Sequence, residues 1–223
     1  MPRLLLIGHG RMGQLVETLA PEYGFEVTGA IARGNAGAAW PDAEVAIDFS
    51  AADAVPVTVE KLAPRGTPLV IGTTGWQSRE QEIRDAVARH GIGVVAAPNF
   101  AVGVNLFLAL IERVGALMSP QAGFGAWIHE LHHAAKKDAP SGTALAMERA
   151  LRQAGYATAV PIASTRAGTI PGTHTLGFDA VSETITITHS ARDRAAFARG
   201  ALEAARWIQG RHGWFTMKDV LGL

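Results

Sequence analysis

The chain has 223 residues, of which 48% are hydrophobic and 18% are charged, and this balance excludes a disordered protein. Twenty basic residues match twenty acidic ones, so no charge excess indicates a nucleic-acid partner. Cysteine is absent and no apolar run approaches the roughly 18 residues of a membrane span, so we expect a cytoplasmic globular protein without disulfides, thiolate metal ligands, a signal peptide or membrane segments.

The first segment combines a short apolar run with a glycine-rich turn. Residues 4–7 are typical of a strand buried on both faces, and residues 14–20 have helical spacing. Between them the sequence follows the pattern G-x-G-x-x-G, in which the first glycine permits a tight turn. The second lets a pyrophosphate approach the backbone, and the third lets the helix pack on the strand. A dinucleotide site is therefore predicted, with an ordinary strand–helix turn as the alternative. Its residues are Gly8, His9, Gly10, Arg11, Met12 and Gly13.

The next expected strand, residues 25–32, ends without the carboxylate that usually binds the ribose of NAD. That acidic residue is expected about 20 positions after the glycines, and Arg33 stands there instead. An arginine at this place suits the 2′-phosphate of NADP. We therefore expect NADPH, NADH or both as cofactor, with NADPH favoured. The alternative is a solvated arginine at a strand end.

Three further short apolar runs alternate with helical patterns up to residue 100. Strands are expected at 45–47, 68–71 and 92–96, and helices at 50–62 and 77–90. Ser50 followed by Asp53 is typical of a helix cap. The alternation predicts an α/β protein with a Rossmann-like, doubly wound parallel sheet.

Two polar stretches follow the last two of these strands. In doubly wound sheets, ligands bind at the carboxyl ends of the strands. We therefore expect both stretches to line the cofactor site, although each could be only a turn. The residues concerned are Gly72, Thr73 and Thr74, and Ala97, Pro98, Asn99 and Phe100.

After residue 100 the pattern changes to that of an α+β domain. Helices are expected at 101–118, 141–154 and 194–209, and strands at 125–133, 160–165, 173–178 and 181–189. We interpret residues 101–203 as an inserted substrate-binding and oligomerisation domain. Residues 1–100 and about 204–223 then form the dinucleotide-binding domain. The flat second sheet would suit a sheet-to-sheet homotetramer.

The segment 129–137 carries three histidines and two lysines, just ahead of a helix that is expected to begin at Ser141. Backbone N–H groups and the helix dipole favour a bound carboxylate at a helix N-terminus. Proton donors next to such a site therefore indicate an anionic substrate.

The same segment also fits the zinc-protease pattern H-E-x-x-H, from His129 to His133. That pattern requires a helix, which brings both histidines to one metal. The preceding glycines and the pair Trp127-Ile128 favour a strand, in which positions four apart are about 13 Å apart. We therefore predict no metal site. Histidines without a role on a solvated strand remain the other alternative.

With these motifs, nearly the whole chain resembles the 4-hydroxy-tetrahydrodipicolinate reductase (dihydrodipicolinate reductase) family. Residues 130–144 are similar to the family's long pattern E-x-H-H-x-x-K-x-D-x-P-S-G-T-A, which is highly specific. The glycine turn and the two polar stretches after the strands match in the same order. Residues 166–174 and 189–198 resemble its R-x-G-x-x-x-G-x-H and H-x-A-x-x-R-x-x-F stretches.

The resemblance implies reduction of a cyclic dicarboxylate by NAD(P)H, with loss of water, in lysine and diaminopimelate biosynthesis. It implies that His132 is a proton donor or acceptor, that Lys136 is a second donor and that His133 contacts substrate. It also implies that Gly142 and Thr143 hold one carboxylate and that Arg194 faces the other.

The chain departs from the family in being shorter than most relatives and in lacking the acidic residue after the second strand.

Two rival functions are weighed beside the resemblance. One is another two-domain NAD(P) oxidoreductase, such as an amino-acid or imine dehydrogenase. The other is a nicotinamide-sensing or scaffold protein.

Overall fold

The computed structural model describes residues 1–35, 37 and 39–223, and it divides the chain into two compact units. The first comprises Met1–Val102 and Ala195–Leu223, and the second comprises Gly103–Arg194. The second unit is therefore inserted into the first along the chain.

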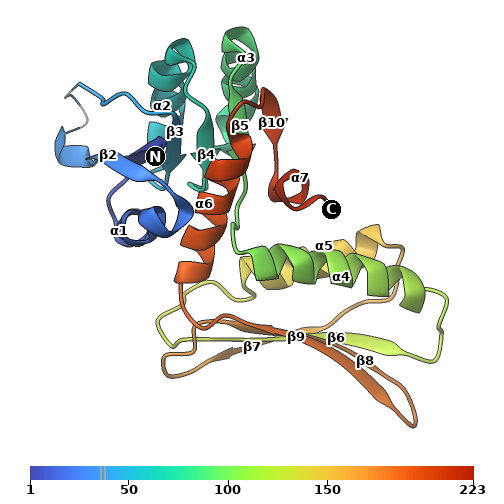
Figure 1. Cartoon of the computed structure of the whole chain (residues 1–223). Coiled ribbons are helices and arrows are strands. Elements are labelled where there is room, and N and C mark those ends of the chain that lie inside the picture. The colour runs from blue at the N-terminus through green and yellow to red at the C-terminus, as the bar shows by residue number, and fades with distance from the viewer. Residues whose placement is uncertain (36, 38) are drawn as a thin grey trace. The chain divides into compact units, whose positions relative to one another are not determined.

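The first unit is built on a six-stranded sheet in the order β10-β5-β4-β3-β1-β2, with every neighbouring pair parallel (Figure 1). This arrangement confirms the predicted Rossmann-like sheet. The strand order reverses between β1 and β3, which is where such sheets bind ligands. The strands are β1 (Arg3–Ile7), β2 (Glu26–Ile31), β3 (Val45–Asp48), β4 (Leu69–Ile71), β5 (Gly93–Ala96) and β10 (Gly213–Phe215).

Helices cover both faces of this sheet because its strands are apolar on both sides. Leu4 and Leu6 of β1 join one core cluster, whereas Leu5 and Ile7 join the other. On the first face lie α1 (Arg11–Leu19), α6 (Ala195–Ile208) and α7 (Met217–Leu221). On the second face lie α2 (Ala54–Leu62) and α3 (Glu80–His90). Short 3-10 turns are η1 (Ala20–Tyr23), η2 (Arg33–Asn35), η3 (Ala63–Arg65) and η4 (Gln77–Arg79).

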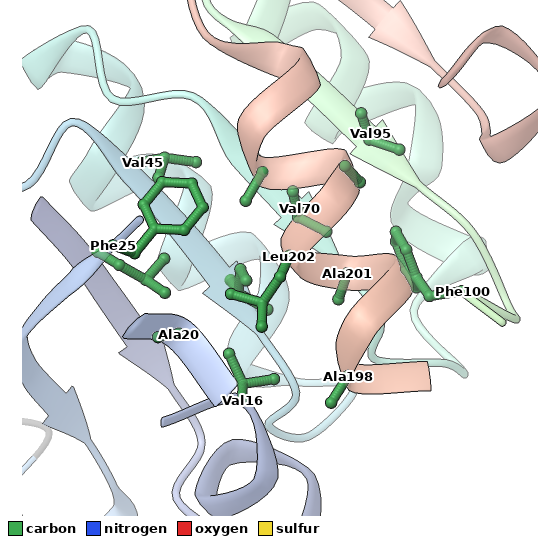
Figure 2. Packing of buried hydrophobic residues seen from close by; sticks show 14 of the residues in the cluster. Val16, Ala20, Phe25, Val45, Val70, Val95, Phe100, Ala198, Ala201 and Leu202 are labelled. Carbon is green, nitrogen blue, oxygen red and sulfur yellow. The ribbon is translucent and has the colours of Figure 1, made fainter. Parts of the chain in front are cut away.

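Helix α6 belongs to the first unit over its whole length, so the inserted unit ends at Arg194 and not near residue 203. Figure 2 shows Ala198, Ala201 and Leu202 of α6 packed among the buried side chains of this core. Small side chains let the helix approach closely: a Cβ on Gly200 would lie 1.7 Å from the carbonyl oxygen of Phe100. A helical periodicity does not indicate which sheet a helix covers.

The predicted cap at Ser50 is wrong. Helix α2 begins at Ala54, with Asp53 at the N-cap and no side-chain hydrogen bond there. The Ser50 hydroxyl instead donates to Asp48 Oδ1 at 2.6 Å. Residue 50 therefore belongs to the turn that follows β3.

The second unit is a four-stranded mixed sheet in the order β7-β6-β8-β9. Strand β6 is parallel to β7 and antiparallel to β8, which is antiparallel to β9. Helices α4 (Val102–Met118) and α5 (Gly142–Gln153) cover one face, and the opposite face is open (Figure 1). The strands are β6 (Gly125–His132), β7 (Ile162–Arg166), β8 (Thr173–Asp179) and β9 (Thr184–Ser190).

The side chains of β6 alternate strictly between these two faces. Ala126, Ile128, Glu130 and His132 are buried, whereas the residues between them are half-buried. The strand predicted for this histidine-rich segment is thus confirmed. Within the described part of the chain, no helix has the length and apolar character needed to cross a membrane.

Candidate functional site

The glycine turn between β1 and α1 has two of the three roles that its spacing predicts, and it leaves open space for the third, a bound pyrophosphate. Gly8 adopts φ +90°, and a Cβ there would lie 2.2 Å from the carbonyl oxygen of Phe49. A Cβ on Gly13 would lie 2.1 Å from the carbonyl oxygen of Gly8. Gly10, by contrast, is the N-cap of α1, and a Cβ added there would meet no atom within 4 Å. As a glycine it also has no side chain that could cap the first N–H groups of the helix. The turn therefore presents backbone N–H groups and open space, as a bound pyrophosphate requires.

A cavity of about 680 Å³ opens where the sheet order reverses. Gly8, His9 and Gly10 line it after β1, and Arg33 lines it after β2. Lys61 of α2 lines the same cavity, with Nζ lying 4.7 Å from the centre of the Trp40 ring. Two cationic side chains thus flank this space, a charge pattern that suits a phosphate group.

A smaller cavity of about 330 Å³ joins the glycine turn to the end of β4. Its lining includes Gly10, Arg11 and Met12, together with all three predicted residues of the Gly72–Thr74 stretch. Since that stretch shares a cavity with the start of α1, the structure brings these two predicted parts of the cofactor site together.

A buried carboxylate that the sequence analysis missed holds this region in place. Asp48, at the end of β3, is 0% exposed, and its Oδ1 accepts from Thr73 Oγ1 at 2.7 Å and from Ser50 N at 2.9 Å. Burial raises the pKa of this carboxyl group. Asp48 thereby ties the turn after β3 to the turn after β4. An acidic residue directly after an apolar strand was the available signal.

The stretch from Ala97 to Phe100 follows β5, as predicted, but none of its residues lines either of these cavities. Phe100 is buried and packs edge-on against Phe49, with ring centres 6.2 Å apart. Asn99 Oδ1 accepts a hydrogen bond from Ala101 N at 2.9 Å. The geometry gives these residues a structural role, and their contact with a cofactor stays a prediction.

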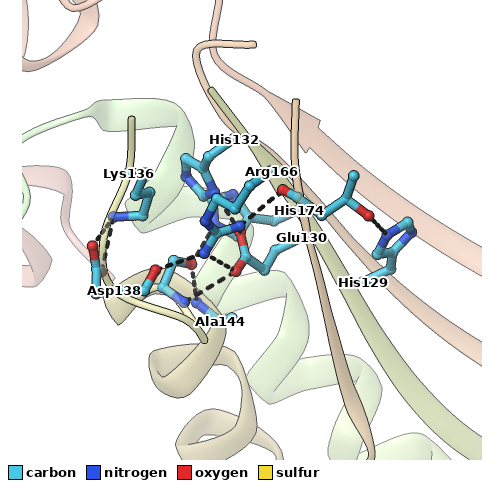
Figure 3. A network of polar contacts seen from close by, with 10 residues as sticks. His129, Glu130, His132, Lys136, Asp138, Ala144, Arg166 and His174 are labelled. Atoms are coloured by element: carbon cyan, nitrogen blue, oxygen red, sulfur yellow. Dashed lines mark hydrogen bonds and ion pairs between the residues drawn. The ribbon is translucent and has the colours of Figure 1, made fainter. Parts of the chain in front are cut away.

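In the second unit, His132 lies at the end of β6, where the residue is only 8% exposed. Its Nδ1 is hydrogen-bonded to Glu130 Oε2, because residues two apart on a strand point to the same face. Figure 3 shows the two side chains at the centre of a polar network. The His132 Nε2 lies beside Gly172, where a Cβ would come within 3.0 Å of it. Burial lowers the pKa of the His132 imidazole.

Glu130 is completely buried, and its carboxylate accepts hydrogen bonds from four donor atoms of Arg166, His132 and Ser141 as well as from the side chain of Ser164. Arg166 of β7 grips it with both terminal nitrogens, Nη2 to Oε1 at 2.6 Å and Nη1 to Oε2 at 3.0 Å. The third donor is His132, and the fourth is the backbone N–H of Ser141, at 3.2 Å from Oε1. Burial would raise the pKa of Glu130, but the hydrogen bonds from Arg166, Ser164 and His132, of which that from Arg166 has the largest effect, lower it to about 2. The carboxylate is therefore ionised at neutral pH.

Lys136 lies on the turn after β6 and contacts both oxygens of Asp138, at 2.7 and 2.8 Å. Arg166 Nη2 also donates to the carbonyl of Asp138 at 2.6 Å, which attaches this turn to the buried network. The Lys136 ammonium adds to the lowering of the His132 pKa by charge repulsion. The two predicted proton donors are therefore near neighbours (Figure 3).

Helix α5 begins at the predicted cap. The Ser141 hydroxyl accepts from Ala144 N at 3.2 Å, which confirms Ser141 as the N-cap. Among the described residues, no group accepts from the N–H of Gly142 or Thr143, the first two residues of the helix. These donors and the helix dipole favour an anion at this end of α5, in the same unit as His132, and the carboxylate site there stays a prediction.

The structure does not join every predicted site residue to this network. His133 is half-buried, and the only hydrogen bond the described structure gives it is that from Lys136 N to its carbonyl, at 3.1 Å. Arg194 is exposed at the end of the second unit, and no contact with the described residues ties it to Glu130 or His132. Their roles toward a substrate stay predictions.

His174 of β8 is a network member that the sequence analysis left without a role. Its Nε2 lies 2.9 Å from Ser141 Oγ, and its ring packs edge-on against His132 with centres 5.0 Å apart. Burial is the main reason that its pKa falls to about 4, so the ring is neutral at pH 7. The available signal was its place at the end of the R-x-G-x-x-x-G-x-H stretch.

The potential metal ligands differ from those of the zinc-protease pattern. Glu130, His132 and His174 place three ligand atoms within 4.8 Å of one another. The Arg166 guanidinium already occupies both oxygens of Glu130, so a metal ion would have to compete with a cation for that carboxylate. The geometry favours a histidine hydrogen-bonded to a carboxylate over a metal centre.

Comparison with known proteins gives matches over both units. Residues 2–100 match the family model described as "Dihydrodipicolinate reductase, N-terminus", and residues 103–221 match "Dihydrodipicolinate reductase, C-terminus". The 4-hydroxy-tetrahydrodipicolinate reductase of Acidiphilium cryptum is 41% identical, over 96% of this chain and 94% of that protein. The corresponding reductase of Thiobacillus denitrificans is 38% identical, over 96% of each chain.

A solved structure has the same fold. Dipicolinate-bound dihydrodipicolinate reductase from Paenisporosarcina sp. TG-14 superimposes with a TM-score of 0.79 at 19% identity, covering 97% of each chain. With both halves matched by family models and relatives aligned over nearly their full length, the chain belongs to the dihydrodipicolinate reductase family.

Proposed function

We propose that this chain catalyses the NAD(P)H-dependent reduction of 4-hydroxy-tetrahydrodipicolinate to tetrahydrodipicolinate, with loss of water, in lysine and diaminopimelate biosynthesis. One observation carries the proposal: a buried histidine and a lysine share a unit with N–H groups at the start of α5 that have no acceptor among the described residues. This arrangement provides proton donors and a carboxylate site together. The relative from Paenisporosarcina, which binds dipicolinate, supports the same chemical class of ligand.

The residues of the second unit bind and protonate the substrate in this proposal. The N–H groups of Gly142 and Thr143 hold one carboxylate, and Arg194 faces the other. NAD(P)H supplies the hydride when bound. His132 and Lys136 provide the proton that completes the reduction as water leaves. A placed general acid contributes about 10²- to 10⁴-fold to the rate.

The first unit binds the cofactor in this proposal, and NADPH is favoured over NADH. Gly10 leaves room for the pyrophosphate, and α1 begins there without a side-chain cap. Arg33 and Lys61 line the larger cavity, and the strand before Arg33 ends without a carboxylate. Two cationic side chains, and the lack of the acidic residue that usually binds the ribose of NAD, suit the 2′-phosphate that distinguishes NADPH.

A direct assay tests the function. Freshly made 4-hydroxy-tetrahydrodipicolinate is mixed with the protein and either nicotinamide, and the loss of absorbance of the reduced nicotinamide is followed. The proposal predicts turnover with both cofactors and a higher kcat/KM for NADPH. Absence of turnover, with NADPH binding intact, would exclude this substrate.

The proposed location is the cytoplasm, since a chain without cysteine forms no disulfides and so does not depend on an oxidising compartment.

The proposed assembly is a homotetramer formed through the open face of the second sheet. This face carries Trp127, whose ring fills the space above Gly177, and threonine pairs such as Thr175 and Thr188. Thr186→Arg, opposite Gly177, should dissociate the tetramer in light scattering. Thr158→Arg, on an exposed loop, serves as the control.

A further inference from the structure

Glu130 lies beneath the proposed proton donor and has no access to solvent. Burying an ionised carboxylate is costly, and a buried ion pair is often no more stabilising than apolar side chains of the same size. A gain in folding stability therefore does not account for an ionised glutamate at this buried position. This holds despite its bidentate contact with Arg166 and its bonds to His132 and Ser141. The hydrogen-bond chemistry of the group indicates another role.

An ionised carboxylate can only accept hydrogen bonds. Since Glu130 Oε2 is bonded to His132 Nδ1, that nitrogen must carry a hydrogen. The hydrogen of a neutral imidazole can occupy only one of its two nitrogens, so Nε2 is the nitrogen that gains or loses the proton. The Nε2 atom lies on the other side of the ring, beside Gly172, where no side chain covers it from that residue.

We propose that Glu130 is a positioning residue, which orients His132 with the hydrogen on Nδ1 and so makes Nε2 the proton-transferring atom, while Arg166 holds the carboxylate in place. This inference rests on the proposed function for the identity of the reaction. It assigns no contact between Glu130 and substrate.

Four charged or titratable groups act on the His132 ring. Arg166 from β7 and Lys136 from the turn after β6 repel a proton on it, and His174 from β8 packs against it. Burial also lowers the pKa of His132, whereas Glu130 raises it through its hydrogen bond and its charge. Glu130 is thus the group that favours the protonated histidine. Removing its charge should lower the pKa of His132 further.

The closing experiment compares Glu130→Gln, Glu130→Asp and wild type, with Glu183→Gln as a control on an exposed turn of the same unit. In Glu130→Gln, kcat should fall by about 10-fold to 10⁴-fold, the range for losing a carboxylate that orients a histidine. The pH at which kcat declines on the alkaline side should move downward. Glu130→Asp should retain more activity than Glu130→Gln, and NADPH affinity should be unchanged in both.

Nitrogen NMR of histidine-labelled wild type tests the tautomer without relying on a buried substitution. His132 is assigned by its absence from His132→Gln, and the neutral ring should carry hydrogen on Nδ1. A neutral ring with hydrogen on Nε2 would overturn the inference. So would a Glu130→Gln enzyme with an unchanged pH profile, or equal losses in the Asp and Gln variants without a pH shift. An inactive wild type that still showed the Nδ1–H tautomer would instead refute the proposed reaction.

Discussion

The glycine turn allows the effect of a single methyl group on ligand binding to be separated from its effect on folding. At Gly10 a methyl group meets no atom within 4 Å, and φ −79° and ψ −165° are ordinary values for alanine. At Gly13 the same methyl group would lie 2.1 Å from the carbonyl oxygen of Gly8, so the backbone must shift. Gly10→Ala should therefore occupy space that the pyrophosphate needs, whereas Gly13→Ala should strain the protein itself.

The expected magnitudes follow from this geometry. Gly10→Ala should change the free energy of unfolding by less than about 1 kcal/mol, because substitution of glycine at a compatible backbone position has an effect of that size. Its Kd for NADPH should rise at least about tenfold, which corresponds to about 1.4 kcal/mol. Gly13→Ala should lose about 1–3 kcal/mol or more of stability, as overpacking does.

Fluorescence titration with NADPH and NADH, combined with urea unfolding, measures both quantities in each variant. Gly123→Ala, on an exposed turn of the second unit where a Cβ likewise meets no atom within 4 Å, controls for the added methyl group. If Gly10→Ala binds NADPH within a factor of two of wild type, the space above Gly10 does not hold the pyrophosphate. The assignment of the glycine turn would then be wrong.

Three further predictions use other parts of the molecule. Lys136→Ala should lower kcat by about 10²-fold or more with little change in NADPH affinity, while Lys137→Ala should resemble wild type in the same steady-state assay. Arg33→Ala should raise the KM for NADPH far more than that for NADH; equal effects, or an effect as large in the exposed Arg89→Ala, would remove the 2′-phosphate assignment. The pKa of Glu130 is about 2 in the fold and has the ordinary value of 4.5 in the unfolded chain, so its contribution to stability is complete above about pH 4.5 and is lost as the pH falls toward 2. Urea midpoints measured across this range should fall less in Glu130→Gln than in wild type.

Local patterns were sufficient to predict the first sheet and the start of α5. Apolar runs flanked by helical periodicities identify buried parallel strands, and the roles of Gly8 and Gly13 follow from the motif spacing. Ser141 was recognisable as a cap because capping depends only on the next three residues. The histidine-rich segment was recognisable as a strand from its glycines and its alternation.

Contacts that depend on strand register were beyond local patterns. Arg166 and Glu130 are 36 positions apart, and they meet because β7 pairs with β6 in one particular alignment. Ser50 was predicted to cap a helix but donates to Asp48 instead. The sequence alone does not separate these outcomes, because a serine side chain can bond to the backbone of a helix start or to a nearby side chain. The boundary near residue 203 was misplaced because the small residues of α6 indicate close packing but not against which sheet.

The guanidinium of Arg166 is shared between Glu130 and the carbonyl of Asp138, and this has a consequence for the two proposed proton donors, His132 and Lys136. Asp138 binds Lys136, and Glu130 binds His132. The Arg166 guanidinium contacts both Asp138 and Glu130, so it links the surroundings of the lysine to those of the histidine. The energetic effects of altering Lys136 and His132 should consequently be non-additive. The two proposed acids would then behave as one cooperative unit, in which a change at one alters the effect of a change at the other.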